Sequence, residues 1–407
     1  MRKLLAFTLL SVTLAAGLTA GASDRVPGQL VVQLRPHSSV VALSKAYGLR
    51  VLATSSFSNL VLLGAGNNTN LASLAARVAR DARVLSASPN WTARSQDGSA
   101  TPSTTPIKDQ WVIGSDGTDG ITFYDSQPAL GQINYGPISQ RYSGAGVTVA
   151  ILDTGISNQN PNLVAPVAPG WNYIDNNSNT NDVPANLTTY QAGTSDHVAG
   201  HGTMVAGLVA RYAPGATLLP VKVLNSDGQG SLWTVTQGIS FAMSKHAKVF
   251  NLSFGMTQPS TVLDKAIAAA VNGGAVIVTS AGNLNSSAPQ YPASNPNVIT
   301  VGGLNGDNTK SGFSNYGSSV AVDAPSVGLI STFWDGRFAA WSGTSFSAPI
   351  VSAEAALLFS QGATSLSVKS RIRNTSHSVD SANPAYQGQL GKSNQGLIDF
   401  DWALSGN

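Results

Sequence analysis

The chain has 407 residues, of which 42% are hydrophobic and 11% are charged, and this is enough for one large folded domain and a smaller one. It contains no cysteine, which excludes disulfides, thiolate metal sites and a cysteine nucleophile. The formal net charge is +3, but residues 23–97 are basic in sum and the later residues are acidic. The basic block does not interleave aromatic with basic residues, so we expect no nucleic-acid partner and instead docking on the acidic part of the same chain.

The first residues have the pattern of a secretory signal. Arg2 and Lys3 precede an apolar run over residues 4–18, and the small residues 20–22 follow it. This pattern predicts a signal peptide over residues 1–22 that is removed on export. The run is short for a bilayer span, and no later segment is long and uncharged enough for one. We therefore expect a secreted protein, in the extracellular space or the cell envelope, with no membrane span.

Residues 23–94 are expected to form a small α+β domain. Strand patterns cover residues 29–34, 59–63 and 83–88, and helix patterns cover residues 40–47 and 71–80. Residues 95–107 are rich in Gly, Ser, Thr and Pro, which is typical of a flexible linker. We place the domain boundary there and assign residues 108–407 to a second, larger domain.

The larger domain alternates short apolar runs with helical patterns. The expected strands are residues 147–152, 218–224, 249–252, 275–279 and 298–301, and the expected helices are residues 204–210, 232–244 and 261–271. Continuous apolar strands are typical of a sheet that is buried on both faces. The predicted fold class is therefore α/β, with a largely parallel sheet and helices on both faces. Functional residues of such sheets lie just beyond the carboxyl ends of strands.

A serine at the start of a helix is the candidate nucleophile. Gly343, Thr344 and Ser345 lead into an apolar helical run, and Pro349 fits only a first helical turn. Ser345 would then lie at the positive end of the helix, where backbone amides stabilise a developing oxyanion. An ordinary helix cap is the alternative for this triplet taken alone.

An acid and a histidine are the candidate partners of this serine. Asp153 follows the run 147–152, where a carboxylate is costly unless its charge is used, for example to orient a histidine. His201 begins a helical pattern that glycines flank, and it is the best candidate for a base. A plain Asp-Thr-Gly turn and a zinc site on His197 and His201 are the alternatives, but the zinc site lacks the glutamate that such sites require. A single-chain aspartic protease would need a second Asp-Thr-Gly.

Asp153, His201 and Ser345, in this order and with these flanks, resemble the subtilisin-like serine proteases, which form the subtilase (peptidase S8) family. The resemblance covers the larger domain. It implies acyl transfer, with His201 as the general base, Asp153 orienting it and Ser345 attacking a peptide carbonyl. It also implies an oxyanion donor, Asn283, which ends a run of small residues.

The resemblance further implies a substrate cleft formed by three segments. Residues 225–231 and 251–255 would be edges that hold an extended peptide by backbone pairing, and the third segment precedes Asn283. The residues implied in substrate binding are Gly228, Gly230, Ser253, Phe254, Gly255, Ala281 and Gly282. No acid lies between Asn283 and Asp307, where the family builds the floor of its primary pocket. We therefore expect apolar or aromatic residues before the cut.

Residues 29–93 resemble the inhibitory propeptide of these proteases in pattern and position. The expected partners are this propeptide and protein or peptide substrates, for a monomeric enzyme of broad specificity that processes itself. A histidine base, in place of the carboxylate of a related acid-acting family, favours activity at neutral to alkaline pH. Two alternatives stay open: a catalytically silent subtilase that serves as a binding protein, and a processing protease of narrow specificity.

Three residues depart from the family pattern without removing a catalytic group. Met204 stands where the family often has a second histidine, Ser326 where it usually has glycine, and Phe346 where methionine or a small residue is commoner. The chemistry requires no cofactor. If an ion is bound, we expect a structural calcium in the oxygen-rich runs 172–182 or 305–308, with ligands unknown.

Overall fold

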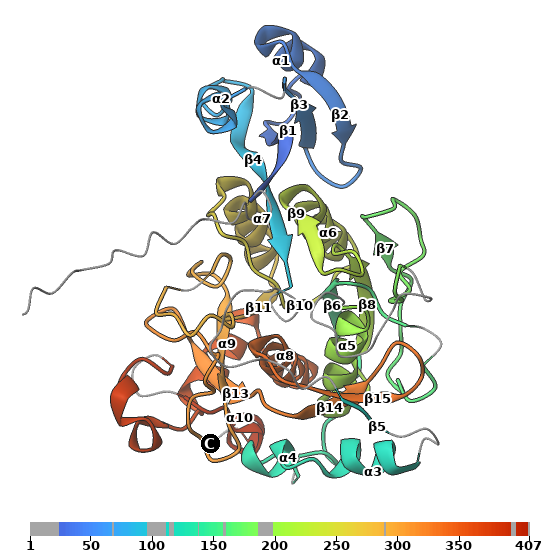
Figure 1. Ribbon diagram of the computed structural model, residues 1–407, viewed down its shortest axis with the longest axis vertical. Helices are drawn as coiled ribbons and strands as arrows, with labels where there is room; N and C mark the ends of the chain where they lie inside the picture. Colours follow the sequence, from blue (N-terminus) through green and yellow to red (C-terminus); the bar gives the residue numbers. More distant parts are fainter. Residues whose placement is uncertain are drawn as a thin grey trace, which may run out of the picture.

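The computed structural model describes residues 24–66, 69–95, 111–113, 118–136, 138–157, 160–185, 198–288, 290–391 and 396–405. The expected signal peptide and the expected linker after Ser95 lie outside the described residues. A small N-terminal unit lies against one end of a larger α/β unit (Figure 1). In the part of the chain that is described, no helix has the length and hydrophobicity that crossing a membrane requires.

The N-terminal unit packs two helices on an antiparallel sheet. Its strands follow the order β2-β3-β1-β4, and β9 of the larger unit continues the sheet beyond β4. Ser39 and Asn70 cap the two helices, because each side chain accepts a hydrogen bond from a first-turn amide. Apolar side chains between the helices and the sheet form a separate core. The elements are β1 (Arg25–Leu34), α1 (Val40–Tyr47), β2 (Arg50–Thr54), β3 (Leu60–Gly64), α2 (Leu71–Val78) and β4 (Val84–Arg94).

The larger unit is built on a seven-stranded sheet in the order β13-β12-β11-β10-β6-β8-β7, and all its paired strands are parallel. The strands are β6 (Thr148–Asp153), β7 (Trp171–Asn172), β8 (Thr217–Lys222), β10 (Val249–Leu252), β11 (Val276–Ser280), β12 (Ile299–Leu304) and β13 (Val322–Pro325). Successive side chains of β6 belong alternately to two cores, which lie on opposite faces of the sheet.

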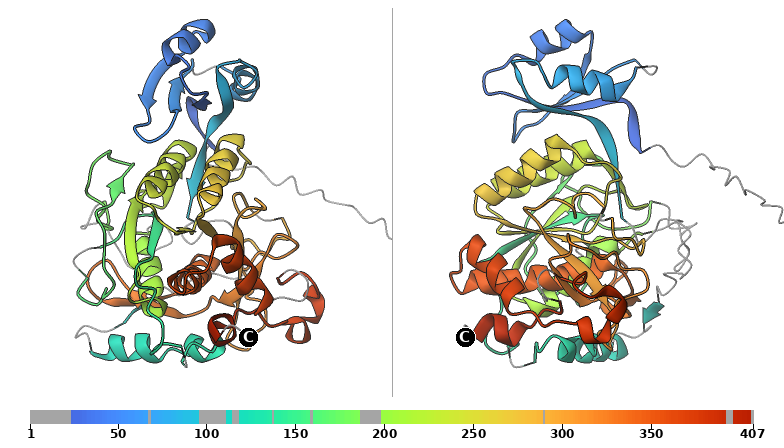
Figure 2. Two further views of the ribbon diagram at one scale, coloured as in Figure 1. Left: turned by 180° about the vertical axis from the view of Figure 1, so that it is seen from behind. Right: turned by 90° about the vertical axis from the view of Figure 1, so that its left-hand side faces the viewer.

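Helices cover both faces of this sheet, so the predicted fold class is confirmed. α5 and α8 contribute to one core, and α6 and α7 contribute to the other (Figures 1 and 2). These helices are α5 (His201–Tyr212), α6 (Leu232–Ser244), α7 (Thr261–Asn272) and α8 (Thr344–Ser360). Both α5 and α8 begin at the edge of the sheet where the parallel strands end, which brings their first residues together.

Smaller elements surround this framework. A second sheet has the order β14-β15-β5. The remaining elements are β5 (Trp111–Ile113), α3 (Thr118–Ser126), α4 (Ala129–Gln132), β9 (Gln229–Ser231), β14 (Leu329–Thr332), β15 (Phe338–Trp341), α9 (Ser365–Asn374), the 3-10 turns η1 (Asp380–Ala382) and η2 (Pro384–Tyr386), and α10 (Phe400–Ser405). None of these was predicted as a helix or strand, and β2, β7 and β13 were also missed.

Candidate active site

A buried histidine and a buried aspartate meet at the carboxyl end of β6. His201 Nδ1 lies 2.7 Å from Asp153 Oδ1, and both side chains are fully buried. The same oxygen accepts the amide of Thr154 at 2.7 Å, which fixes the carboxylate. Gly202 lets α5 come this close, since a Cβ there would lie 2.2 Å from the Gly155 carbonyl oxygen. The hydrogen bond fixes the orientation of the imidazole.

A second aspartate, Asp182, holds the start of α5 in place. Its two oxygens accept the amides of Gly200 and Thr203, each at 3.0 Å, and the hydroxyl of Thr203 at 2.8 Å. Burial raises the pKa of Asp182, while the charge of Lys222 and these hydrogen bonds act against that rise. Lys222, whose own pKa burial lowers, donates to the carbonyl of Thr154. No sequence pattern indicates this supporting role, because Asp182 and Lys222 are distant from the histidine motif.

Ser345 occupies the first turn of α8, as its sequence pattern indicated. It is fully buried, and its hydroxyl has no hydrogen-bond partner in the described part of the chain. The hydroxyl of Ser253 donates to the Ser345 carbonyl at 2.8 Å. Asn251 orients Ser253 through a 2.9 Å hydrogen bond. Ser253, expected to contact substrate, therefore also anchors the turn that carries the candidate nucleophile.

The Asn283 side chain is tied to the turn that precedes Ser345. Its Oδ1 accepts both the amide and the hydroxyl of Thr344 at 2.9 Å. The backbone donor identifies Oδ1 as the oxygen, so the orientation of the side-chain amide is set. The Thr344 hydroxyl in turn accepts the amide of Gly282 at 3.0 Å. These contacts bring the candidate oxyanion donor to the candidate nucleophile.

A buried asparagine that sequence reasoning missed shapes the segment around Asn283. Asn315 Nδ2 donates to the Ala281 carbonyl at 2.9 Å, and its Oδ1 accepts the amides of Leu284 and Ser286 at 3.0 Å. The Asn315 amide also donates to the Gly282 carbonyl at 2.8 Å. The segment around Asn283 thus folds around the side chain of Asn315. In the sequence, Asn315 lies in a polar run that resembles an ordinary loop, so no pattern indicates this role.

Phe346, left unexplained by the sequence, belongs to an aromatic cluster under the histidine. Its ring centroid lies 5.2 Å from that of His201 and 5.3 Å from that of Trp341. Trp341 also lies 5.9 Å from His201. The imidazole is therefore confined by packing as well as by Asp153. Met204 is simply a core residue, and the carbonyl of Ser326 accepts the Gly343 amide at 2.8 Å.

The end of the chain's own β4 lies beside β9, which belongs to a segment predicted to bind substrate (Figure 1). Thr92 and Ala93 pair antiparallel with Ser231 and Gly230. Arg94 exchanges two backbone hydrogen bonds with Gly255, each 2.9 Å, and the Ser95 amide donates to the Gly228 carbonyl at 2.8 Å. Both predicted edges therefore hold an extended segment by backbone pairing, which is strand addition.

Direction matters in this pairing. Because Arg94 pairs antiparallel with Gly255, the strand runs toward Ser253, whose hydroxyl contacts Ser345. Phe254 is only 1% exposed. A bound peptide can therefore contact the backbone of Phe254 but not its ring. Ala281 and Gly282 lie beside Asn283, where the segment turns at Gly282 with a φ of +105°.

Side chains of the N-terminal unit also form hydrogen bonds at the starts of two helices of the larger unit. Asn90 Oδ1 accepts the Trp233 amide at 3.0 Å, in the first turn of α6. Ser88 accepts a 3.0 Å hydrogen bond from Ser260, the N-cap of α7. These hydrogen bonds and the β-pairing join the two units, and none of them is an ion pair.

Comparisons with known proteins agree with this geometry. A parallel α/β fold with a His–Asp pair beside a serine at a helix start is typical of a serine hydrolase. Residues 144–395 match the Subtilase family model. Thermitase from Thermoactinomyces vulgaris is 38% identical over 239 residues, which cover 58% of this chain and 83% of thermitase. Subtilisin E from Bacillus subtilis (strain 168) is 36% identical over 264 residues, which cover 62% of this chain and 65% of that protein.

Solved structures show the same fold. Fervidolysin from Fervidobacterium pennivorans aligns with a TM-score of 0.74 at 24% identity and covers 96% of this chain and 62% of that one. A cold adapted subtilisin-like serine proteinase aligns with a TM-score of 0.53 at 29% identity, over 64% of this chain and 89% of that one. The chain belongs to the subtilase family and is a subtilisin-like serine endopeptidase.

Proposed function

We propose that the chain is a secreted precursor that cuts itself and then hydrolyses proteins with Ser345 as its nucleophile. The observation that carries this proposal is the position of residues 92–95, which pair with both cleft edges and run toward Ser345. A segment held in this way is both a substrate and an inhibitor. The N-terminal unit is then the propeptide, and residues 95–107 contain the link to be cut.

The mechanism follows from the positions of four side chains. Neutral His201 accepts the hydroxyl proton of Ser345 as the oxygen attacks the carbonyl carbon, and Asp153 holds the imidazole tautomer and stabilises the imidazolium. Asn283 Nδ2 and the Ser345 amide donate to the oxyanion. His201 then protonates the leaving amine, and water repeats the sequence on the acyl-enzyme. Hydrogen bonds between base and nucleophile commonly tighten only when substrate is bound.

The mature enzyme is proposed to have broad specificity, with apolar or aromatic residues before the cut. Asp264 accepts hydrogen bonds from Tyr291 and Asn295, which lie in the segment after Asn283, each at 2.6 Å. The Asp264 carboxylate therefore already has two hydrogen-bond partners within the protein, and we do not expect it to bind a basic side chain of the substrate. Digestion of a protein mixture, with the new ends read by mass spectrometry, tests this preference; cleavage mainly after Lys or Arg would contradict it.

Expression of the precursor beside a Ser345→Ala variant tests the function as a whole. We expect the parental chain to lose its N-terminal unit and to cleave casein, and the variant to stay intact and inactive. A silent binding protein would leave both chains uncut. A narrow processing protease would mature itself but leave casein intact.

No cofactor is proposed for the chemistry, and a structural calcium ion stays a prediction. In the run 172–182, Asp182 is used to cap α5, although Asn181 Oδ1 is buried without a partner among the described residues. In the run 305–308, Asp307 accepts two hydrogen bonds from Thr309. No three His, Asp or Glu side chains converge in the described ranges. Melting with calcium and with a chelator tests for the ion.

A further inference from the structure

A buried lysine, Lys310, lies in the loop between β12 and β13, and the proposed mechanism does not use it. Lys310 is 8% exposed. Its ammonium group donates three hydrogen bonds, to Asn285 Oδ1 at 2.8 Å and to the carbonyls of Ser311 and Ser314 at 2.9 Å and 3.0 Å. An ammonium group has three donor hydrogens, so these acceptors satisfy all of them. None of the three acceptors carries a charge.

Two aromatic rings also contact this ammonium group. The ring centroids of Tyr316 and Tyr386 lie 5.4 Å and 4.9 Å from Lys310 Nζ, which is within the range of cation–π attraction. Three oxygen acceptors and two rings thus contact the same positive charge. Removal of the lysine side chain would leave these groups without their cation.

The ammonium group joins two segments that shape the oxyanion site. Asn285 is two residues after Asn283, and Ser314 directly precedes Asn315, whose side chain bonds to the segment around Asn283. The Asn285 amide also donates to the carbonyl of Phe313 at 2.7 Å. The ammonium group therefore donates to both segments where they lie against one another.

We propose that Lys310 is a positioning residue for the oxyanion donor Asn283, because its charge holds residues 311–316 against residues 281–286. A charge-assisted hydrogen bond is roughly twice as strong as one between neutral groups, so a single ammonium group restrains acceptors on both segments. Asn283 can act strongly only if it is aimed where charge develops. The inference rests on the proposed roles of Ser345 and Asn283.

Kinetics and chemical rescue test this role. Hydrolysis of a chromogenic peptide is measured at constant ionic strength and at pH 7, below the pKa of about 8 to which burial lowers Lys310. Lys310→Ala should lower kcat about tenfold or more and change KM little. n-Propylammonium replaces the atoms that this substitution removes, so it should restore kcat in a saturable way. The neutral 1-propanol should not.

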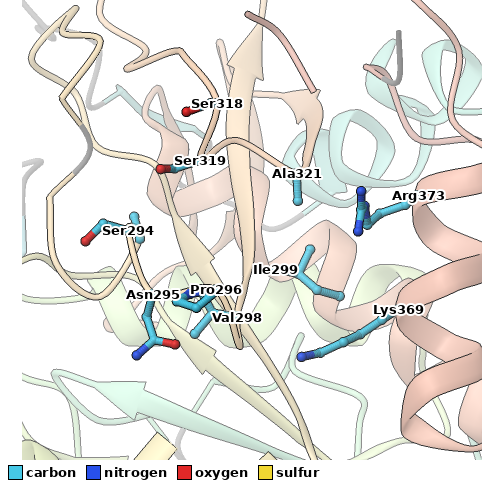
Figure 3. A pocket seen from close by; sticks show the side chains of 11 residues that line it. Ser294, Asn295, Pro296, Val298, Ile299, Ser318, Ser319, Ala321, Lys369 and Arg373 are labelled. Carbon is cyan, nitrogen blue, oxygen red and sulfur yellow. The ribbon is translucent and has the colours of Figure 1, made fainter. Parts of the chain in front are cut away.

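Lys369→Ala is the matched control. Lys369 is half-buried, its ammonium group donates to the carbonyl of Asn297, and burial lowers its pKa as well. Figure 3 shows its side chain extending from α9 into a pocket that Val298 and Ile299 also line. This variant should keep the parental kcat and should not respond to n-propylammonium.

Hydrogen exchange gives a readout that needs no peptidase activity. In the Ser345→Ala chain, addition of Lys310→Ala should speed exchange of the amides of residues 284–286 about tenfold or more, because this segment opens more often. The increase in α6 should be smaller. n-Propylammonium should slow the exchange of residues 284–286 again.

The proposal is overturned if folded Lys310→Ala keeps the parental kcat, or if the loss falls on KM instead. It is also overturned if 1-propanol restores kcat as well as n-propylammonium does, since packing and not charge would then matter, or if the Lys369→Ala control loses kcat equally. If Lys310→Ala does not fold, Lys310→Met, which keeps most of the aliphatic stem, decides through the same kcat and exchange measurements. Faster exchange in a chain whose parent hydrolyses no peptide would support the contact between the two segments and overturn the proposed function.

Discussion

The side-chain amide of Asn283 has a fixed orientation, because its carbonyl oxygen accepts two hydrogen bonds from Thr344. An oxyanion donor acts strongly only if it is already aimed where charge develops. Thr344 provides this preorganisation, since it is adjacent to Ser345 and joined to Gly282. The candidate nucleophile and the candidate oxyanion donor are thus held together through Thr344.

Asn283→Leu should therefore lower kcat by about 10²–10³-fold and change KM little, because the lost bond forms mainly in the transition state. Steady-state hydrolysis of a chromogenic peptide measures both constants. A rise in KM with kcat preserved would assign Asn283 to substrate binding instead.

Asn315 is expected to be a positioning residue for the same donor. Asn315→Ala removes three side-chain hydrogen bonds to the segment around Asn283, so kcat should fall about tenfold or more with KM nearly constant. Combined with Asn283→Leu, it should cost little more than Asn283→Leu alone. Asn160→Ala is a matched control, because Asn160 is also buried but bonds to the Phe333 carbonyl. Additive losses would mean that Asn315 only stabilises the fold.

Sequence patterns predicted which residues would do the chemistry, but not which residues hold them in place. Asp153, His201, Asn283 and Ser345 each stand at a recognisable strand end or helix start, and the structure brings these parts together. Asp182 and Asn315 could not be found in this way, since their roles depend on contacts between segments distant in sequence. The contacts of the Phe346 ring with His201 and Trp341 likewise depend on tertiary packing, which no local pattern contains.

At the scale of elements, β13 contains a fully buried aspartate, Asp323, whose environment is unfavourable for a charged carboxylate. Both oxygens of Asp323 are buried without a hydrogen-bond partner among the described residues. Burial raises its pKa to about 7, and the charge of Lys310, whose own pKa burial lowers to about 8, opposes that rise. The folded chain therefore keeps this proton at pH values where the unfolded chain has lost it.

This difference predicts that Asp323→Asn stabilises the protein at pH 8 but not at pH 4. As pH rises from about 4 to about 7, the unfolded state releases the proton first, so native stability falls by the cost of the buried charge. The amide avoids that cost, and we expect a gain of about 1–3 kcal/mol at pH 8. Urea unfolding of the inactive Ser345→Ala chain at both pH values measures it. An equal effect at pH 4 and pH 8 would exclude titration of Asp323.

The end of β4 allows a test of whether the proposed propeptide docks through its backbone hydrogen bonds. Arg94→Pro removes the amide that donates to Gly255, so maturation of the precursor should slow about tenfold or more. Arg94→Ala keeps both backbone hydrogen bonds and should mature at nearly the parental rate. Pulse-labelled precursor followed on gels gives these rates. Similar rates for Arg94→Pro and the parent would mean that this pairing does not guide the cut.

Elements with a clear local pattern were predictable, and elements that depend on pairing with a distant segment were not. α6 and β10 have the predicted bounds, because their apolar patterns and flanking residues are clear. β4 reaches Arg94 instead of residue 88, since its last residues pair with β9, which has only three residues. Pairing between units is a tertiary effect that no local pattern contains.

At the scale of the whole molecule, the two units share one sheet through β4 and β9, which lie side by side in Figure 1. The sequence predicted the two units and a basic N-terminal part. It did not predict that hydrogen bonds to the first turns of α6 and α7 would contribute to the docking. This arrangement is the one that the proposed self-processing precursor requires, because the segment to be cut would also occupy the cleft.

Covalent labelling tests the central claim most directly. The mature protein is treated at pH 8 with a peptidyl phosphonate that has an aromatic residue at the reactive position, digested and analysed by mass spectrometry. We predict one adduct, on Ser345, that is absent when substrate competes and absent in His201→Ala. A protein that hydrolyses peptides but forms no adduct, or forms it on another residue, would contradict the assignment of Ser345 as the nucleophile.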